Sequence, residues 1–420
     1  MIRFEIKKIF SKTANKIGLI VLLAAIAVTC YFAISSMDYV DEEGDTHTGI
    51  AAARYLRDTK AEWEGLITED VLREVIRQNR LINETYPDSP TDIKTSNTGY
   101  SKKQGFSDIR DLINSGFSEF REHNYYRADS LSEDEVGKLY DNRILNLEKW
   151  LNSDEAKDQF SEKEKAFLVS QYQKLETPFY YEYAGGFTAA LDYAPTIIML
   201  TVLIMSFFVA GIFSNEFGWK ADSVFFSARY GRNRGTFSKI AAGLIVITGV
   251  YWLVILIYSA VVFSVAGIGG ANCVIQTSWA FWKSFYNITY LQAYLLTVIG
   301  GYVGALFILA VSMLVSAKTH TTVLAVTIPF VLLFIQSFLG GFSVLSDVLG
   351  LLPDQLLQIN MAIKTFTLYE IGGKVIGSVP IILTIYSVLF LIILPVLYQV
   401  YRKTEITVSY THLTLPTIRL

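Results

Sequence analysis

The sequence predicts an all-α polytopic membrane protein, and two observations carry this prediction. The chain of 420 residues is 52% hydrophobic and only 18% charged, whereas soluble domains usually carry about 25% charged residues. It also contains six apolar stretches without Asp, Glu, Lys or Arg, each close to the length of about 20 residues that a spanning helix needs. These stretches are Ile17–Ser35, Pro195–Phe213, Ile240–Ile268, Tyr290–Ala317, Thr322–Phe342 and Val379–Tyr401.

A buried helix of this length in a soluble protein would keep a polar face, and these stretches have none. They predict six transmembrane helices, the first at residues 17–35 and the other five within residues 195–401. No small-residue cleavage pattern follows the first stretch before the acidic MDYVDEEGD. We therefore interpret the first stretch as a retained anchor and not as a signal peptide.

Residues 1–16, MIRFEIKKIFSKTANK, predict an amphipathic helix that lies in the membrane interface. Ile2, Ile6, Ile9 and Phe10 recur at helical spacing, with lysines on the other face, as in helices that bind membrane lipid. An ordinary basic flank that only fixes the topology is the alternative.

The distribution of Lys and Arg predicts that both chain ends lie in the cytoplasm. Thirteen of these residues flank the predicted spans on one side, and only Lys283, Lys364 and Lys374 lie in the short loops on the other. Positive residues concentrate on the cytoplasmic side of membrane proteins. Residues 38–190 are therefore expected outside the cell.

Residues 38–190 predict a mainly helical extracellular domain. The region holds 31 acidic and 19 basic residues, a net charge of −12, while the rest of the chain has a net charge of +9. Ser132 and Ser161 each precede a glutamate by three positions, the spacing of a capping box, and the stretch 83–105 is predicted to be a loop. The acidic surface would attract cationic peptides, or it serves solubility alone.

Two further regions differ from the spans. Residues 343–378 are too polar to cross a membrane and too apolar for a free loop, and they predict a re-entrant or interfacial helix pair. An amphipathic loop helix is the alternative there. Residues 408–420 bear no relation to the preceding chain, and the run VSYTHLTLPT resembles a translated sequencing adaptor. We interpret this tail as an artefact, with a genuine terminal strand as the alternative.

The sequence lacks the motifs of several functional classes. It has no G-x-x-x-x-G-K-[ST] phosphate loop, no H-E-x-x-H zinc motif and no G-x-S-x-G nucleophile elbow. We therefore predict a protein that is not an enzyme, binds no metal or cofactor itself and has no nucleic-acid partner. The predicted spans also lack the charged residues that ion-coupled transporters use, so the energy for any transport would come from another protein.

The stretch 214–239, SNEFGWKADSVFFSARYGRNRGTFSK, is a polar segment between two apolar ones, on the predicted cytoplasmic side. It holds five basic residues, two acidic residues and three glycines together with several aromatic residues. Its middle can form a short amphipathic helix. A solvated loop whose arginines fix the topology would explain the charges but not the aromatic residues.

This stretch resembles the cytoplasmic loop of ABC transporter type-2 permeases, which has an acid, a glycine, a Gly-Arg turn and a lysine at the start of the next span. The residues that carry the resemblance are Glu216, Gly218, Phe225, Phe226, Tyr230, Gly231, Arg232 and Lys239. Trp219 and Ala221 depart from the pattern, in which a small hydroxyl residue is more usual. The layout of residues 1 to about 407 also resembles a subgroup of this family with a large external domain after the first span.

The resemblance implies a permease subunit of an ATP-driven exporter in the bacterial cell membrane. A separate ABC ATPase subunit, carrying ATP and Mg²⁺, would dock on the 214–239 loop. A second permease half, from a homodimer or a sister permease, would complete the path for an amphiphilic peptide, lipid or drug-like substrate. Glu216 and Arg232 are expected to fix the shape of the loop, while Phe225 and Phe226 dock on the ATPase.

A function from another class stays open. The chain could be a membrane sensor or scaffold whose extracellular domain binds a ligand without transport. A membrane enzyme ranks third, because no constellation of nucleophile, base or metal ligands is visible.

Overall fold

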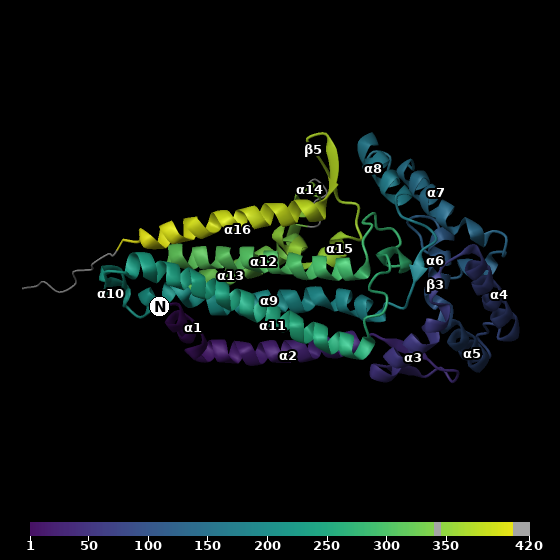
Figure 1. Ribbon diagram of the computed structural model, residues 1–420, viewed down its shortest axis with the longest axis horizontal. Helices are drawn as coiled ribbons and strands as arrows, with labels where there is room; N and C mark the ends of the chain where they lie inside the picture. The colour runs from purple at the N-terminus through teal and green to yellow at the C-terminus, as the bar shows by residue number, and fades with distance from the viewer. Residues whose placement is uncertain (340–345, 406–420) are drawn as a thin grey trace, which may run out of the picture.

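The computed structural model describes residues 1–339 and 346–405. The molecule is elongated: long apolar helices form a bundle, and a polar body of shorter helices covers one end of it (Figure 1). The sheets within the described residues are short antiparallel pairs of strands. The tail, residues 408–420, lies outside the described residues.

Among the described residues, five helices are long and apolar enough to cross a membrane, which is the architecture of a multi-pass membrane protein. They are α2 (Thr13–Ser35), α9 (Gly185–Gly218), α11 (Thr236–Ala266), α12 (Tyr290–Thr319) and α16 (Ser378–Arg402). The sixth predicted span, Thr322–Phe342, continues past the described residues. Its described part, α13 (Thr322–Leu339), packs against α9 and α12. The 18 residues of α13 rise about 27 Å, slightly less than the hydrocarbon thickness of about 30 Å.

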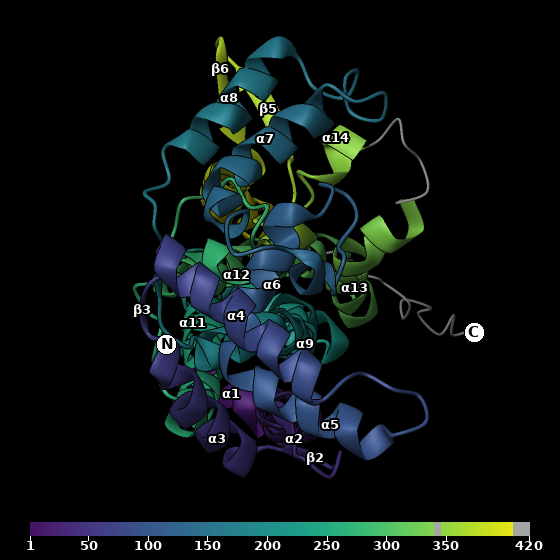
Figure 2. The same ribbon diagram turned by 90° about the vertical axis from the view of Figure 1, so that its right-hand side faces the viewer.

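Helix α9 lies at the centre of the bundle and begins earlier than predicted. The predicted span starts at Pro195, but the helix begins at Gly185 and continues through the proline. Ala190, Leu191 and Ala194 are fully buried, so packing in this part outweighs the backbone hydrogen bond that the proline removes. Helices α2, α11, α12 and α13 all pack against α9, which is seen end-on in Figure 2.

Local side-chain signals set the ends of α12. The Thr289 side chain accepts a hydrogen bond from the Gln292 backbone, and the Gln292 side chain accepts one from the Thr289 backbone, which forms a capping box. At the other end His320 has a φ of +57°, and α13 begins two residues later at Thr322. The left-handed residue therefore reverses the chain between two long helices.

The N-terminal helix α1 (Ile2–Ser11) is shorter than the predicted helix of residues 1–16, whose last four residues belong to α2, and its charged face is not turned wholly away from the protein. Lys12, in an extended conformation, separates α1 from α2. Phe4 is 75% exposed, whereas Glu5 and Lys8 reach side chains of α11 and α9. The sequence could not show this orientation, because the partners of these charges lie more than 200 residues away.

Residues 38–184 form the polar domain, which is mainly helical as predicted. Its helices are α3 (Ile50–Lys60), α4 (Glu69–Thr85), α5 (Ile93–Lys103), α6 (Ser107–Phe117), α7 (Leu139–Leu151) and α8 (Glu162–Gln173). Strand β1 (Asp38–Val40) pairs with β2 (Thr46–Thr48), and β3 (Gly65–Leu66) pairs with β4 (Tyr180–Tyr181). Short 3-10 turns η1 (Ala61–Trp63), η2 (Gln104–Phe106), η3 (Arg127–Ser130) and η4 (Val136–Lys138) join these elements. The domain has its own apolar core, which includes Leu72, Ile76, Ile109 and Leu112.

The predicted loop 83–105 is wrong in its second half, which forms α5. Asp92 caps this helix by accepting a hydrogen bond from the Thr95 backbone at 3.2 Å. The helix contains few apolar residues, so hydrophobic periodicity could not reveal it. Of the two predicted capping boxes, Ser161 begins α8 with a complete box, whereas Ser132 precedes a 3-10 turn and not an α-helix.

A buried arginine joins the polar domain to the loop between α11 and α12, which contains the 3-10 turn η6 (Ile275–Thr277). Arg143 is 3% exposed and donates hydrogen bonds to the carbonyls of Trp282, at 3.2 Å, and Ser284, at 3.1 Å. Its guanidinium also lies 3.8 Å from the centroid of the Tyr172 ring. Because these carbonyls satisfy the buried cation, domain and bundle are held together at this point.

The segment between α13 and α16 is described from residue 346 onward, so residues 343–345 of the predicted re-entrant element lie outside the described residues. Its middle part packs into the bundle against α12. The segment contains α14 (Ser346–Leu349), the 3-10 turn η8 (Pro353–Leu357), α15 (Ile359–Ala362) and a hairpin of β5 (Leu368–Ile371) with β6 (Lys374–Gly377). Leu356, Leu357 and Ile359 are fully buried. Gly372 and Gly373 turn the hairpin at positive φ, as a two-residue turn requires.

Two glycines of α12 make room for this segment. A Cβ atom at Gly300 would overlap the Cδ1 atom of Ile359 and lie 3.2 Å from the carbonyl oxygen of Leu356. A Cβ atom at Gly304 would lie 2.7 Å from the Cδ2 atom of Leu357. Small residues four positions apart on a spanning helix allow a neighbouring backbone to approach closely.

We predict that Gly300→Ala destabilises the protein by about 1–3 kcal/mol, because the Leu356 carbonyl cannot move as freely as a side chain. Gly249→Ala in α11 is the matched control, since no atom lies within 4 Å of its Cβ position. That change should be neutral or stabilising, because alanine favours a helix over glycine. Thermal unfolding in detergent measures both, and equal melting temperatures for the two variants would contradict the packing argument.

Candidate functional site

The stretch that carries the family resemblance folds into a compact connector between α9 and α11. We call residues 219–235 the connecting loop. It contains the short helix α10 (Asp222–Ser227) and a single π-helical turn, η5 (Gly231–Gly235), that leads into α11. Lys220 has a φ of +54° and sharply ends the path of α9. The loop lies at the end of the bundle opposite the polar domain, beside α1 and the C-terminal end of α16 (Figure 1).

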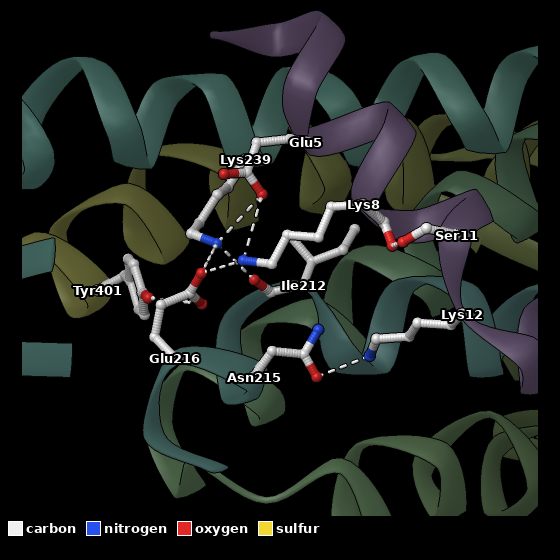
Figure 3. Close-up of polar contacts among 9 residues, drawn as sticks. All are labelled: Glu5, Lys8, Ser11, Lys12, Ile212, Asn215, Glu216, Lys239 and Tyr401. Carbon is white, nitrogen blue, oxygen red and sulfur yellow. Dashed lines mark hydrogen bonds and ion pairs between the residues drawn. The ribbon is translucent and has the colours of Figure 1, made fainter. Parts of the chain in front are cut away.

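A buried ion cluster lies directly under the connecting loop (Figure 3). The ammonium group of Lys239, with a side chain 0% exposed, lies 2.8 Å from Oε1 of Glu216 and 3.3 Å from Oε2 of Glu5, and donates to the Ile212 carbonyl at 2.9 Å. The ammonium group of Lys8 contacts the same Oε1 atom of Glu216. Two carboxylates thus balance two ammonium groups, and they come from α1, α9 and α11.

Burial makes this cluster a strong constraint on the helices that supply it. The side chains of Glu216 and Lys239 are 6% and 0% exposed. Removing two charges from water is costly, and the pair is tolerated only while both partners stay in contact. The cluster therefore fixes how the end of α9, the start of α11 and α1 lie relative to one another.

Two further contacts hold α1 beside α9. The ammonium group of Lys12 donates to the side chain of Asn215 at 2.7 Å (Figure 3). The ring of Trp219 lies 4.9 Å from the ammonium group of Lys8 and 5.9 Å from that of Lys12. Trp219, a departure from the family pattern, is thus the point where the connecting loop contacts α1.

An aromatic cluster packs the inner side of the connecting loop against α16. Phe226 is 4% exposed, and its ring centroid lies 5.1 Å from that of Tyr401 and 6.0 Å from that of Phe217. Phe225 lies 5.8 Å from Tyr401. Phe217 in turn stacks on His320, with centroids 3.6 Å apart, which brings the turn between α12 and α13 into the same cluster.

Arg232 joins the connecting loop to the end of α16. It donates to the carbonyls of Arg402 and Thr404, both at 2.9 Å, and to the carbonyl of Phe226 at 3.2 Å. The last carbonyls of a helix have no partner within the helix, and a cation there also interacts favourably with the helix dipole.

The three glycines of the stretch 214–239 have different roles. A Cβ atom at Gly231 would overlap the carbonyl oxygen of Phe225, and one at Gly235 would lie 2.9 Å from the Phe225 ring. Both positions therefore need glycine for close packing. At Gly218 no atom lies within 4 Å of the Cβ position, so the structure gives no reason for glycine there.

The expectation that Phe226 docks on a partner is wrong for this structure, because its ring is buried between Tyr401 and Phe217. The exposed apolar residues of the connecting loop are Trp219 at 57%, Val224 at 71% and Tyr230 at 41%. The sequence could not separate the two groups. An apolar residue of a short helix can face inward or outward, and six residues of α10 are too few to set a face by periodicity.

Part of the ion cluster was not predicted from the sequence. Glu216 and Lys239 were named as loop residues, whereas Lys8 was expected on the lysine-bearing face of the interfacial helix and Glu5 was given no role. One signal was present: Glu5 is the single acid among the first 16 residues. Such an acid can pair with a lysine one turn away on the same helix, so the sequence alone does not indicate a distant partner.

A second candidate site lies in the polar domain, where a cavity of about 390 Å³ reaches the ends of α2 and α9. Lys60, Asp108, Asp111 and Asp192 line it, and Lys60 is bound to Asp108 at 2.5 Å. A larger hollow of about 930 Å³ adjoins it and shares Lys60 and Asp111. Burial and the neighbouring Asp108 carboxylate raise the pKa of Asp111 to about 6.

Neither site has the ligands of a metal centre. Among residues 1–339 and 346–405, no three His, Cys, Asp or Glu side chains lie in position to hold a metal ion. Comparison with known proteins adds no assignment: no protein family matches the chain, and neither the curated proteins nor the solved structures that were compared provide a match.

We predict that Glu216→Gln lowers the stability of the protein by about 3 kcal/mol, because it leaves the Lys239 ammonium group buried with only Glu5 nearby. Adding Lys239→Met to the same variant should restore much of the loss, since Glu5 and Lys8 then balance each other. Thermal unfolding of the two single variants and the double variant measures the coupling. Strictly additive losses would show that the two side chains do not form a coupled pair.

A second prediction concerns Asp111. Its pKa is raised in the folded protein from an ordinary value near 3.8 to about 6, so ionisation destabilises the folded state as the pH rises from about 4 to above 6. Asp111→Asn should therefore raise the stability at pH 7 by on the order of 2 kcal/mol and have little effect at pH 4. Melting curves at both pH values measure this, and a stabilisation of equal size at pH 4 would contradict the assignment.

Proposed function

We propose that this chain is the membrane-spanning permease subunit of an ATP-driven exporter of the ABC type-2 kind. A separate ATPase subunit, which carries ATP and Mg²⁺, would dock on the connecting loop and on α1. The observation that supports this most is the ion cluster, because it makes the loop, α1 and the ends of two long helices one mechanical unit.

Force on the connecting loop would reach the bundle through three sets of contacts. Glu216 and Lys239 tie α9 to α11, Lys8 ties α1 to α9, and Arg232 ties the loop to α16. Separating the buried charges would cost several kcal/mol, so the helix ends would move together rather than slide apart. A loop fixed in this way suits the transfer of motion from a nucleotide-driven partner.

The proposed function implies an orientation in the membrane for the rest of the chain. The chain would have six spans with both termini in the cytoplasm of a bacterial cell, and the polar domain would lie outside. One such chain would be half of a transporter, so a second copy or a sister permease would complete the path. The apolar spans suit an amphiphilic substrate, which is a peptide, a lipid or a drug-like molecule.

A second function is favoured by a different observation. The cavity beside Asp111 and the adjoining hollow are of a size that suits small-molecule ligands. The cavity also reaches the ends of α2 and α9. A membrane sensor or scaffold would use this site to bind a ligand outside the cell and to shift these helices, without transport. The two functions differ in one testable respect: a permease subunit would capture an ATPase through its connecting loop, whereas a sensor or scaffold would not.

We predict that the double variant Val224→Asp with Tyr230→Asp loses at least tenfold of its affinity for the ATPase, because exposed apolar anchors usually dominate such interfaces. The experiment co-expresses the chain with an ATPase encoded beside its gene and compares the amounts that co-purify. Leu145→Asp is the control, since Leu145 is 57% exposed in the polar domain at the other end of the molecule.

Two outcomes would contradict the proposal. Capture that is unchanged by the double variant would remove the connecting loop from the interface. Transport of a substrate into vesicles by the purified chain alone, without any ATPase, would overturn the permease assignment itself.

A further inference from the structure

Several cations at the connecting-loop end have no internal ion pair or hydrogen bond among the described residues, and Arg3 and Arg234 are two of them. Lys8 and Lys239 bind Glu216, and Arg232 binds backbone carbonyls. By contrast, neither Arg3 nor Arg234 forms an ion pair or hydrogen bond with any residue of the ranges 1–339 and 346–405. Arg234 lies only over the ring of Tyr230, at 4.8 Å.

Both arginines line the same groove. The groove has a volume of about 710 Å³ and lies between α1, the π-helical turn η5 and the end of α16. Its apolar lining comes from Ile2, Phe237 and Tyr398. Two unpaired positive charges thus lie beside the apolar lining of this groove.

We propose that this groove binds an anionic phospholipid, with the phosphate held between Arg3 and Arg234 and an acyl chain along Phe237 and Tyr398. A guanidinium group matches a phosphate in geometry and forms strong, charge-assisted hydrogen bonds with it. Basic pockets between helix ends at a membrane surface are suited to anionic headgroups. The ligand is therefore defined by two features together, a negative phosphate and a hydrocarbon chain.

The apolar residues around the groove favour a lipid over a docked protein or a free phosphate. Phe237, which lines the groove beside Tyr398, is 61% exposed. A free phosphate would satisfy the arginines but leave these rings in water. Tyrosine, here Tyr398, is enriched at the membrane interface, where an acyl chain would cover both rings.

Such a lipid would also connect two elements of the ion cluster. Arg3 lies on α1 one turn from Lys7 and close to Glu5, and Arg234 lies in η5, five residues before Lys239. A phosphate between the arginines would hold α1 against the start of α11 from outside, in parallel with the buried pairs. This inference does not depend on an ATPase partner.

The test is native mass spectrometry of the full chain in detergent, with added phosphatidylglycerol, phosphatidylcholine or inorganic phosphate. The wild type should retain phosphatidylglycerol in preference to phosphatidylcholine. Arg3→Gln with Arg234→Gln should weaken that binding by roughly tenfold to thirtyfold. The matched control, Lys7→Gln with Arg229→Gln, removes the same charge from exposed residues outside the groove and should change the binding less than threefold.

Three results would overturn the proposal. Equal losses in the two double variants would show diffuse attraction to positive charge, and equal retention of the two lipids would show a non-selective surface. Binding of inorganic phosphate as tight as that of phosphatidylglycerol would identify an anion site without a lipid. Melting curves provide a second readout, in which phosphatidylglycerol should stabilise the wild type but not the Arg3 and Arg234 variant.

Discussion

The buried pairing of Glu216 with Lys239 is the constraint on which one end of this molecule depends. Neither charge could remain in the protein interior without the other, and each belongs to a different long helix. Lys8 and Glu5 complete the balance from α1. The position of α1, the course of the connecting loop and the packing of the aromatic cluster on Tyr401 all follow from keeping these four charges together.

Different interactions stabilise the opposite end of the molecule, where the polar domain meets the bundle. There, glycines of α12 admit the segment between α13 and α16, and Arg143 is satisfied by backbone carbonyls of the loop after α11. Close packing and buried hydrogen bonds attach the polar domain to the bundle, together with one exposed ion pair between Lys163 of α8 and Glu370 of β5. The Asp111 cavity lies at this junction, so a ligand there would contact both parts of the molecule.

The two ends suggest how the proposed parts would act together. A rigid, charge-locked end is suited to receive force from a partner, and a lipid in the groove of Arg3 and Arg234 would brace the same helices from the membrane side. The Asp111 cavity is lined by residues of the polar domain and of the ends of α2 and α9. Movement of these helices would therefore change the shape of the cavity. Communication between the ends would run through α9, which contributes to both.

The sequence by itself determined the membrane character of the chain, the approximate positions of five long apolar helices and the helical nature of the polar domain, and it singled out Glu216 and Lys239 without showing that they pair. These follow from charge-free length and from local periodicity, which are properties of neighbouring residues. Only the tertiary structure decided that Glu5 and Lys8 join Glu216, that Phe226 faces inward and that α9 begins at Gly185. Each of these depends on partners distant along the chain, and the free energy of burying a group is set by what surrounds it in space.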